Sequence, residues 1–230
     1  MKKCILAATV LALLLTASAC GTSAPAPESG TLTPSGENRA AGEVTITPTP
    51  QENDGAAGAL AGGSYRNGTA HLRCTLDESW LLYNEAQLSE LNGVVAESGA
   101  GALAENGNAV YDMYAVSTDG LMTINVTYQN LGLLSGSSMT AQDYAERAVE
   151  PLTADLTDCG FTDVSVQVTS SELAGTSGCP TITVTAAAQA VPMYERIVCI
   201  QAGNYIYCVT LCSFTEDVTA DMAALFHRAV

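Results

Sequence analysis

Apolar and polar positions divide the chain into three stretches. Residues 5–16 form an apolar run without charge, which follows Lys2, Lys3 and Cys4. Residues 21–64 contain mainly Gly, Ala, Ser, Thr, Pro and Glu, with almost no large apolar side chain. Beyond them, apolar residues recur with the periods of strands and helices. This pattern predicts a leader at 1–19, a linker at 20–64 and one globular domain at 65–230.

The leader ends in small residues and a cysteine, Leu15-Thr16-Ala17-Ser18-Ala19-Cys20. It resembles a bacterial lipoprotein signal peptide with its lipobox, a family in which the cysteine receives a diacylglyceryl group and a peptidase cuts just before it. The resemblance implies lipid attachment at Cys20 and anchoring at the extracytoplasmic face of the cell membrane. Two acyl chains hold a protein firmly, whereas one binds only marginally.

Two other kinds of leader fit part of the same pattern. A membrane-spanning helix needs ~20 apolar residues, and the run here is shorter. A plain secretory signal would be cut after Ala17-Ser18-Ala19, which is an acceptable A-x-A site. The cysteine directly after that site favours the lipoprotein.

The linker holds five of the eight prolines of the chain. A segment of this composition cannot bury enough surface to offset its ordering entropy, so the sequence predicts a disordered tether. About 44 residues span roughly 35–40 Å as a flexible coil. The tether is therefore expected to hold the domain off the membrane.

Charge narrows the possible partners. Without the leader, the chain has six basic residues, all arginine, against 24 acidic ones, a net charge of −18. Such a charge repels nucleic acid and anionic lipid headgroups at long range, so no nucleic-acid partner is expected. The absence of lysine also excludes lysine Schiff bases, P-loops and Ser-x-x-Lys catalysis.

The first half of the domain predicts a strand, a corner, a helix and a hairpin. A strand at 69–76 precedes a tight corner with Trp80, the only tryptophan, which is interpreted as a structural anchor. Asn84 and Gln87 have the spacing of a capping box, and Asn92-Gly93 predicts the end of that helix. Strands at 109–117 and 121–128 flank the type I′ turn signal Asp119-Gly120.

The register expected for this hairpin has one apolar and one polar face. The apolar face would hold Tyr111, Met113, Ala115, Ile124, Val126 and Tyr128. The polar face would hold Asp112 and Tyr114 with Thr123, Asn125 and Thr127.

The second half predicts a long helix, a strand meander and a terminal helix. Thr140 and Asp143 have capping-box spacing, Pro151 is expected to kink or split the helix, and Gly160 ends it. Strands follow at 164–169, 172–174, 181–187, 193–200 and 205–214. An amphipathic helix then covers 218–226, with His227-Arg228 at its C-terminal end.

This order of elements, together with Trp80, resembles the PsbP-like α/β sandwich. The resemblance implies an α+β fold with an antiparallel β-sheet flanked by helices on both faces. That family includes many bacterial lipoproteins and serves mainly as non-catalytic binding or accessory modules. It implies no transferable active-site residues.

Six cysteines lie in the domain: Cys74, Cys159, Cys179, Cys199, Cys208 and Cys212. Six cysteines allow 15 disulfide connectivities. The turn signal Gly203-Asn204 places Cys199 opposite Cys208 at a non-hydrogen-bonded pair, where Cα atoms approach to ~4.5 Å. These two form a possible disulfide in an oxidising compartment, and the cysteines as a set are interpreted as small buried apolar residues.

Other candidate chemistry is sparse. His71 and His227 lie far apart in sequence, with no HExxH, GxSxG or EF-hand pattern near either. His71 is interpreted as a partly exposed strand residue and His227 as a charge at a helix C-terminus. Asp155, Asp158 and Asp163 are interpreted as a solvated acidic turn rather than a calcium site, because Ca²⁺ needs six or more oxygens held in place.

The sequence therefore predicts a membrane-anchored extracytoplasmic lipoprotein with a non-catalytic binding or accessory domain. Its expected partners are the membrane, through the lipid anchor, and an envelope or cell-wall component or another envelope protein. No cofactor, metal or catalytic residue is expected. Two alternatives stay open: an envelope- or glycan-acting hydrolase with paired carboxylates ~5–9.5 Å apart, and a thiol-redox lipoprotein, against which the absence of Cys-x-x-Cys argues.

Overall fold

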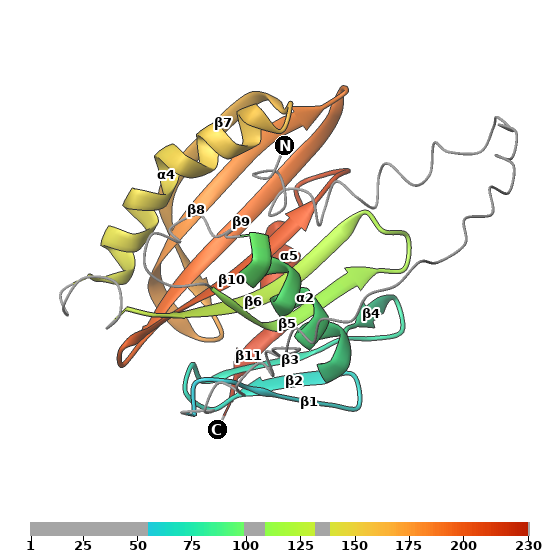
Figure 1. Cartoon of the computed structure of the whole chain (residues 1–230), viewed down its shortest axis with the longest axis vertical. Coiled ribbons are helices and arrows are strands. Elements are labelled where there is room, and N and C mark those ends of the chain that lie inside the picture. The colour runs from blue at the N-terminus through green and yellow to red at the C-terminus, as the bar shows by residue number, and fades with distance from the viewer. Residues whose placement is uncertain (1–54, 99–108, 132–138, 230) are drawn as a thin grey trace, which may run out of the picture.

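A computed structural model of the chain describes residues 55–98, 109–131 and 139–229 (Figure 1). The described residues form eleven strands and three helices. Cys20, the leader and the linker as far as residue 54 lie outside them. No helix in the described ranges is long and apolar enough to cross a membrane.

The strands form two antiparallel sheets. The large sheet has seven strands in the order β4-β5-β6-β10-β9-β8-β7. Their bounds are β4 Trp80–Leu82, β5 Val110–Ser117, β6 Met122–Asn130, β7 Thr162–Leu173, β8 Thr176–Ala188, β9 Val191–Ala202 and β10 Tyr205–Ser213. The small sheet has the order β1-β2-β3-β11, with β1 Ala59–Ala61, β2 Ser64–Asn67, β3 Leu72–Thr75 and β11 Phe226–Arg228.

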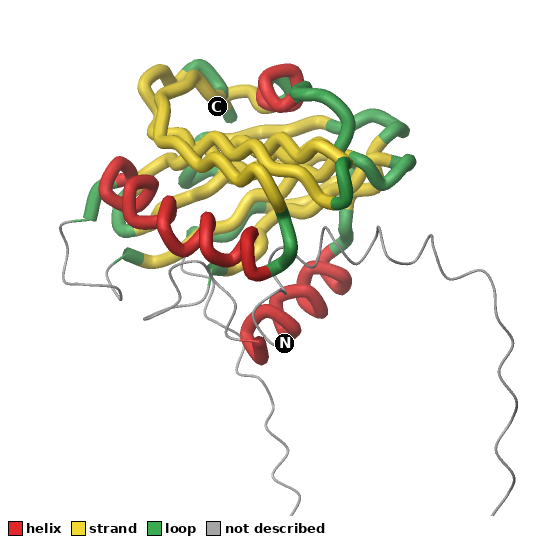
Figure 2. The backbone as a smooth tube through the Cα atoms, turned by 90° about the horizontal axis from the view of Figure 1, so that it is seen from above, coloured by secondary structure: helices red, strands yellow, loops and turns green. Residues whose placement is uncertain are grey.

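The small sheet packs on one face of the large sheet. Tyr65, Leu72 and Cys74 of the small sheet share a buried apolar cluster with Val126 and Val209 of the large one. In the view of Figure 2 the yellow strands form superposed layers. Helix α5, Thr219–Ala223, contributes Met222 to the same cluster.

The other face of the large sheet is covered by the two longer helices. Helix α4, Ala141–Asp158, packs Ala145, Ala148 and Leu156 against apolar side chains of β7, β8 and β9. Helix α2, Glu85–Ser98, packs Leu88 and Val95 on β5. Figure 1 shows the two helices over different parts of the sheet.

The expected fold class, a single antiparallel sheet flanked by helices on both faces, is wrong. The chain is mostly antiparallel β-structure in two sheets, and a second sheet covers the face where helices were expected. Three strands of that second sheet, β1, β2 and β11, are only three or four residues long. Strands this short contain too few alternations for the pattern of apolar residues to reveal them.

The β9–β10 hairpin confirms the register expected from its turn. Gly203 has a φ of +60°, and Ala202 pairs with Tyr205 across the two-residue loop. Val198 and Val209 face the small sheet. Ile197 and Ile206 face α4.

The β5–β6 hairpin departs from its expected register at one point. A bulge between Tyr111 and Met113 leaves Asp112 without a pairing partner in β6. Tyr111 therefore packs beneath α2, and the Asp112 side chain reaches the small sheet. The two residues have exchanged the faces that simple alternation assigned to them.

Helix α4 begins as predicted and continues through Pro151. Thr140 accepts a hydrogen bond from the Asp143 amide, and the Asp143 side chain accepts one from the Thr140 amide. Buried residues on both sides of Pro151 pack on the sheet, and this burial outweighs the missing backbone donor. The proline therefore does not split the helix.

Two helix ends differ from those expected. The predicted capping box of α2 is present between Asn84 and Gln87, but α2 continues past Asn92-Gly93. The Asn92 side chain bonds both backbone groups of Tyr111 instead of ending the helix. At the C-terminus, the expected helix at 218–226 is shorter, and His227 lies in strand β11.

The folded region begins upstream of Tyr65. Ala56 is 1% exposed, and residues 59–61 form strand β1. The last residues assigned to the linker are therefore part of the small sheet.

Candidate anion-binding face

Cationic side chains face one another across the outer surface of the small sheet. Arg66 of β2 lies directly opposite Arg73 of β3, and Arg73 lies directly opposite His227 of β11. All three are exposed. We call Arg66, Arg73 and His227 the basic row.

The basic row is built by strand alternation. Tyr65, Asn67, Leu72 and Cys74 point inward and are buried, so the residues between them must point outward. Neighbouring strands lie about 4.8 Å apart. Arg66 and Arg73 therefore face each other across neighbouring strands on the outer surface.

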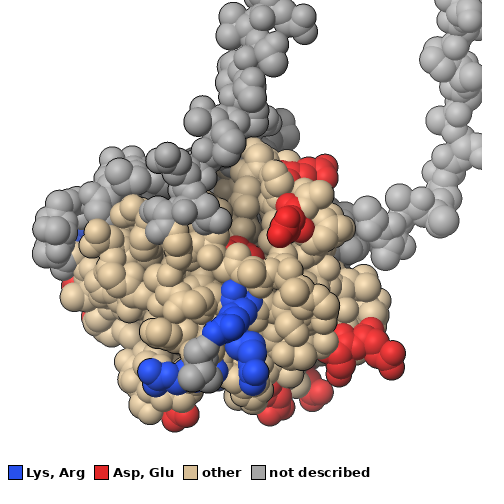
Figure 3. All heavy atoms as spheres, turned by 90° about the horizontal axis from the view of Figure 1, so that it is seen from below, with Lys and Arg blue, Asp and Glu red and all other residues tan. Residues whose placement is uncertain are grey.

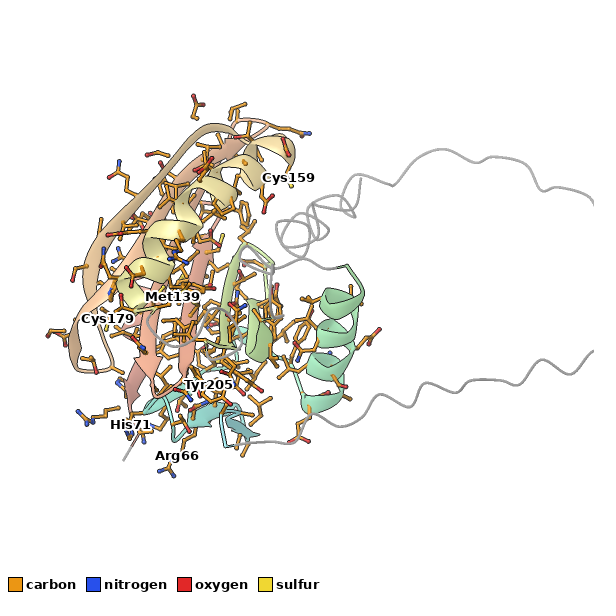
Figure 4. The ribbon with its side chains drawn as sticks, turned by 60° about the vertical axis from the view of Figure 1, so that its left-hand side comes forward. Arg66, His71, Met139, Cys159, Cys179 and Tyr205 are labelled. Carbon is orange, nitrogen blue, oxygen red and sulfur yellow. The ribbon has the colours of Figure 1, made fainter. Side chains whose placement is uncertain are left out.

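Two further cations border the basic row. His71 precedes β3 with a φ of +53°, and Arg228 follows His227 at the end of β11. Both are exposed. Figure 4 places Arg66 and His71 at the outer side of the small sheet, and Figure 3 shows arginine side chains gathered in one area of this face.

The concentration of positive charge is unusual for so acidic a chain. Three of the five described arginines and both histidines belong to this area. Of the other two arginines, Arg147 lies exposed on α4, and Arg196 donates from Nε to Thr219 Oγ1 at 3.1 Å. Net charge predicted repulsion of anions, but it says nothing about where the few cations gather.

An open cleft of about 500 Å³ adjoins one end of the basic row. His227 and Arg228 line it from β11, and Glu172 lines it from the end of β7. The rest of its lining is small or apolar: Ala174, Gly175, Ala220, Ala223, Ala224 and Phe226. The cleft contains one carboxylate, so it does not provide the carboxylate pair of the hydrolase alternative.

A buried carboxylate lies beneath the outer face and joins the two sheets. Asp112 Oδ2 accepts hydrogen bonds from Tyr65 Oη at 2.6 Å and from Asn67 Nδ2 at 2.9 Å. Its Oδ1 accepts one from the Gly58 amide at 2.7 Å. Burial and the nearby Asp112 carboxylate raise the pKa of Tyr65 well above its usual value, which keeps the phenol a hydrogen-bond donor.

The same network holds the start of the described chain. The Ala56 carbonyl accepts from Asn67 Nδ2 at 2.7 Å and from Tyr207 Oη at 2.8 Å. A Cβ on Gly58 would lie 2.7 Å from the Arg66 carbonyl oxygen and from the Tyr65 ring, so this position requires glycine. We call Tyr65, Asn67, Gly58 and Asp112 the interlayer network.

A second carboxyl, Glu195 of β9, is partly buried on the face that α4 covers. It lies opposite Cys212 of β10 and Val184 of β8. Burial raises the pKa of Glu195 to about 7. This group was not singled out in the sequence, because a single Glu within a strand carries no motif.

Cys199 and Cys208 lie directly opposite each other, as their turn predicted. Their sulfur atoms are 3.9 Å apart and unbonded. Their bonding in an oxidising compartment stays a prediction. A hydrogen bond with the Cys208 thiol, together with burial, raises the pKa of Cys199 well above its usual value.

The four remaining described cysteines also form no disulfide bond. Cys74, Cys179 and Cys212 are buried, and Cys159 is partly buried. Burial raises the pKa of Cys74 to about 12 and that of Cys212 well above the usual range. Thiols with raised pKa values are poor nucleophiles at neutral pH, which agrees with a structural role.

The other residues singled out in the sequence have the following positions. Trp80 begins β4, opposite Ser117, and packs against the cluster between the sheets. Asp155, Asp158 and Asp163 stay near the end of α4, and no described group of three His, Cys, Asp or Glu is placed to hold a metal ion. His71 and His227 were treated separately, yet the topology brings both to the small sheet.

Comparison with known proteins gives little further guidance. No family model and no curated protein sequence matches this chain. Among solved structures, it is similar to the solution structure of cyanobacterial PsbP (CyanoP) from Synechocystis sp. PCC 6803, with a TM-score of 0.41 and 13% identity over 83% of this chain and 98% of that one. A TM-score this low establishes neither a shared fold nor a shared function, although the neighbour belongs to the family that the element order resembled.

Proposed function

We propose that this protein is a membrane-anchored extracytoplasmic lipoprotein whose domain is a non-catalytic binding module. We further propose that its binding face is the outer surface of the small sheet and that it recognises an anionic partner. The lipobox and the long linker support the anchor. The alignment of Arg66, Arg73 and His227 across three strands supports the binding face.

The single observation that carries the binding function is the alignment of Arg66, Arg73 and His227 across three strands on the outer face of the small sheet. Neighbouring strands lie about 4.8 Å apart, so an extended anionic partner can contact more than one of these side chains. Arg presents a planar set of donors that suits phosphate and carboxylate groups. The interlayer network beneath provides a fixed platform, because it ties β2 to the bulge of β5.

The anchor is tested by metabolic labelling with a radioactive fatty acid. The wild-type chain is expected to take up label, and a Cys20→Ala variant is expected to lose it. Continued labelling of Cys20→Ala would exclude Cys20 as the attachment site. A Cys4→Ala variant is the matched control and should label normally.

The binding face is tested with inorganic polyphosphate as a soluble probe. Titration calorimetry should show binding that weakens as salt rises, because counterions are released when cations contact a polyanion. The double variant Arg66→Gln/Arg73→Gln should lose most of this binding, whereas Arg147→Gln on α4 should retain it. Equal binding by both variants would contradict the proposed face.

A further inference from the structure

The start of the described chain lies beside the basic row. The Gly55 carbonyl accepts a hydrogen bond from Thr69 Oγ1 at 2.6 Å. A few residues later, Ala59 of β1 pairs directly with Arg66. Any segment that precedes Gly55 therefore joins the domain at the sheet that carries the cations.

Gly55 follows Cys20 by 35 positions. For the linker that the composition predicts, this length corresponds to a root-mean-square span of roughly 30–35 Å. A lipid at Cys20 would therefore keep the small sheet close to the bilayer. Tethering of this kind gives a high effective concentration, so even a weak contact with the membrane surface becomes populated.

We propose that the basic row, with His71 and Arg228, docks on the anionic headgroups of the membrane in which Cys20 is anchored. This inference rests on the proposed anchor and binding face, and it names their partner. Anchoring of acylated proteins commonly combines a lipid with a basic patch. Each arginine near an anionic leaflet raises partitioning about fivefold, and screening confines the effect to about 8 Å at physiological salt.

The chain as a whole is acidic and would repel an anionic membrane, but the same screening limits this repulsion. Charges farther from the membrane than the screening length contribute little to the contact. Acidic residues on other faces, such as Glu146 and Glu150 on the outer side of α4, disfavour docking through those faces. Docking is thus expected in one orientation, with the small sheet toward the bilayer.

Two observations favour a membrane over a soluble anionic polymer. The chain enters the domain at the cationic sheet, which places this sheet nearest the anchor. Arg66 and Arg73 also lie on the exposed outer surface of a sheet, outside the lining of the cleft, and an exposed sheet surface suits a planar array of headgroups. A polymer of the envelope is the competing partner and is an outcome of the test.

The test uses the unlipidated mature chain, residues 20–230 with Cys20→Ser, so that only the domain face can bind vesicles. Sedimentation is measured with phosphatidylcholine vesicles and with vesicles that contain about 30% phosphatidylglycerol. The chain should sediment with the anionic vesicles alone and should be released by about 0.5 M salt. Arg66→Gln/Arg73→Gln should reduce partitioning about thirtyfold, and Arg147→Gln should change it less than twofold.

The outcomes separate this inference from the proposed function. Binding to polyphosphate through Arg66 and Arg73 without binding to anionic vesicles would overturn membrane docking and leave the anionic binding face in place. If the domain binds neither polyphosphate nor anionic vesicles, the anionic binding face and membrane docking are both overturned. Vesicle binding that the double variant retains, or equal binding to neutral vesicles, would also overturn the inference, while circular dichroism confirms that each variant is folded.

Discussion

The two sheets differ in what holds them in place and in what they expose. The large sheet has long strands and is covered on one face by the small sheet and on the other by α4 and α2. The small sheet has strands of three or four residues, buries only its inner face and aligns cations on its outer face. Apolar burial stabilises the first, whereas the second also depends on the interlayer network. The outer face of the small sheet therefore exposes charged side chains, whereas both faces of the large sheet are covered.

The largest expected effect comes from the interlayer network. Asp112→Ala removes the acceptor of three hydrogen bonds, two of them buried, so the free energy of unfolding should fall by about 3–5 kcal/mol. Urea denaturation of the chain without residues 1–19 measures this change. Asp158→Ala, at an exposed site near the end of α4, is the control and should change stability by less than about 0.5 kcal/mol. Similar losses in the two variants would show that Asp112 does not join the sheets.

A smaller effect is expected inside the large sheet, at Cys199 and Cys208. A disulfide between them would close a short loop and stabilise the domain by roughly 2–3 kcal/mol. Intact mass and the unfolding midpoint, measured with and without reductant, should both shift in the wild-type chain. Cys199→Ser should abolish both shifts and Cys212→Ser should preserve them. An oxidised chain of unchanged mass would refute the disulfide.

Glu195 gives the large sheet a pH dependence. Its folded pKa of about 7 lies above the reference value of 4.5, so the folded state binds the proton more tightly. The contribution of protonated Glu195 to the free energy of unfolding is therefore fully present below pH ~4.5, and it is lost as the pH rises to about 7. The difference between these two pKa values corresponds to roughly 3 kcal/mol in the free energy of unfolding. Because Glu195 is only partly buried by its side-chain exposure, the expected loss is about 2 kcal/mol.

Glu195→Gln should remove this loss and raise stability at pH 8. Thermal or urea unfolding between pH 4 and pH 8 gives the comparison directly. Glu146→Gln, on the exposed side of α4, should leave the pH profile unchanged. A Glu195→Gln profile identical to that of the wild type would show that this carboxyl is solvated in the folded protein.

The smallest effect on stability is expected at the basic row. Arg66 and Arg73 are exposed and face each other, so Arg66→Gln/Arg73→Gln should change the free energy of unfolding by less than about 1 kcal/mol. Urea denaturation of the double variant checks this. A loss above about 1 kcal/mol would mean that these arginines stabilise the small sheet.

The sequence predicted the parts of the molecule where long periodic segments decide the structure. The α4 capping box and the β9–β10 register followed from local residues and were confirmed. The small sheet was missed because its strands are short and because β11 follows α5 closely. The bulge at Asp112 carries no signal in the sequence, so alternation assigned this carboxylate to solvent and the interlayer network was not foreseen.

The candidate site was missed for a related reason. The sequence separates Arg66 from His227, and only strand pairing brings both beside Arg73. The alternation of buried and charged residues around Arg73 was visible, but Arg66 was assigned to no strand and His227 was assigned to a helix end. A basic face on an acidic chain therefore becomes apparent only when the topology is known.

The most direct test of the proposed binding face is arginine-selective footprinting of the unlipidated mature chain. A dicarbonyl reagent modifies exposed guanidinium groups, and mass spectrometry reads each site separately. Anionic vesicles should protect Arg66, Arg73 and Arg228 and leave Arg147 on α4 as reactive as before, whereas neutral vesicles should protect none of them. Protection of Arg147 alone, or equal protection of all four, would contradict docking through the small sheet.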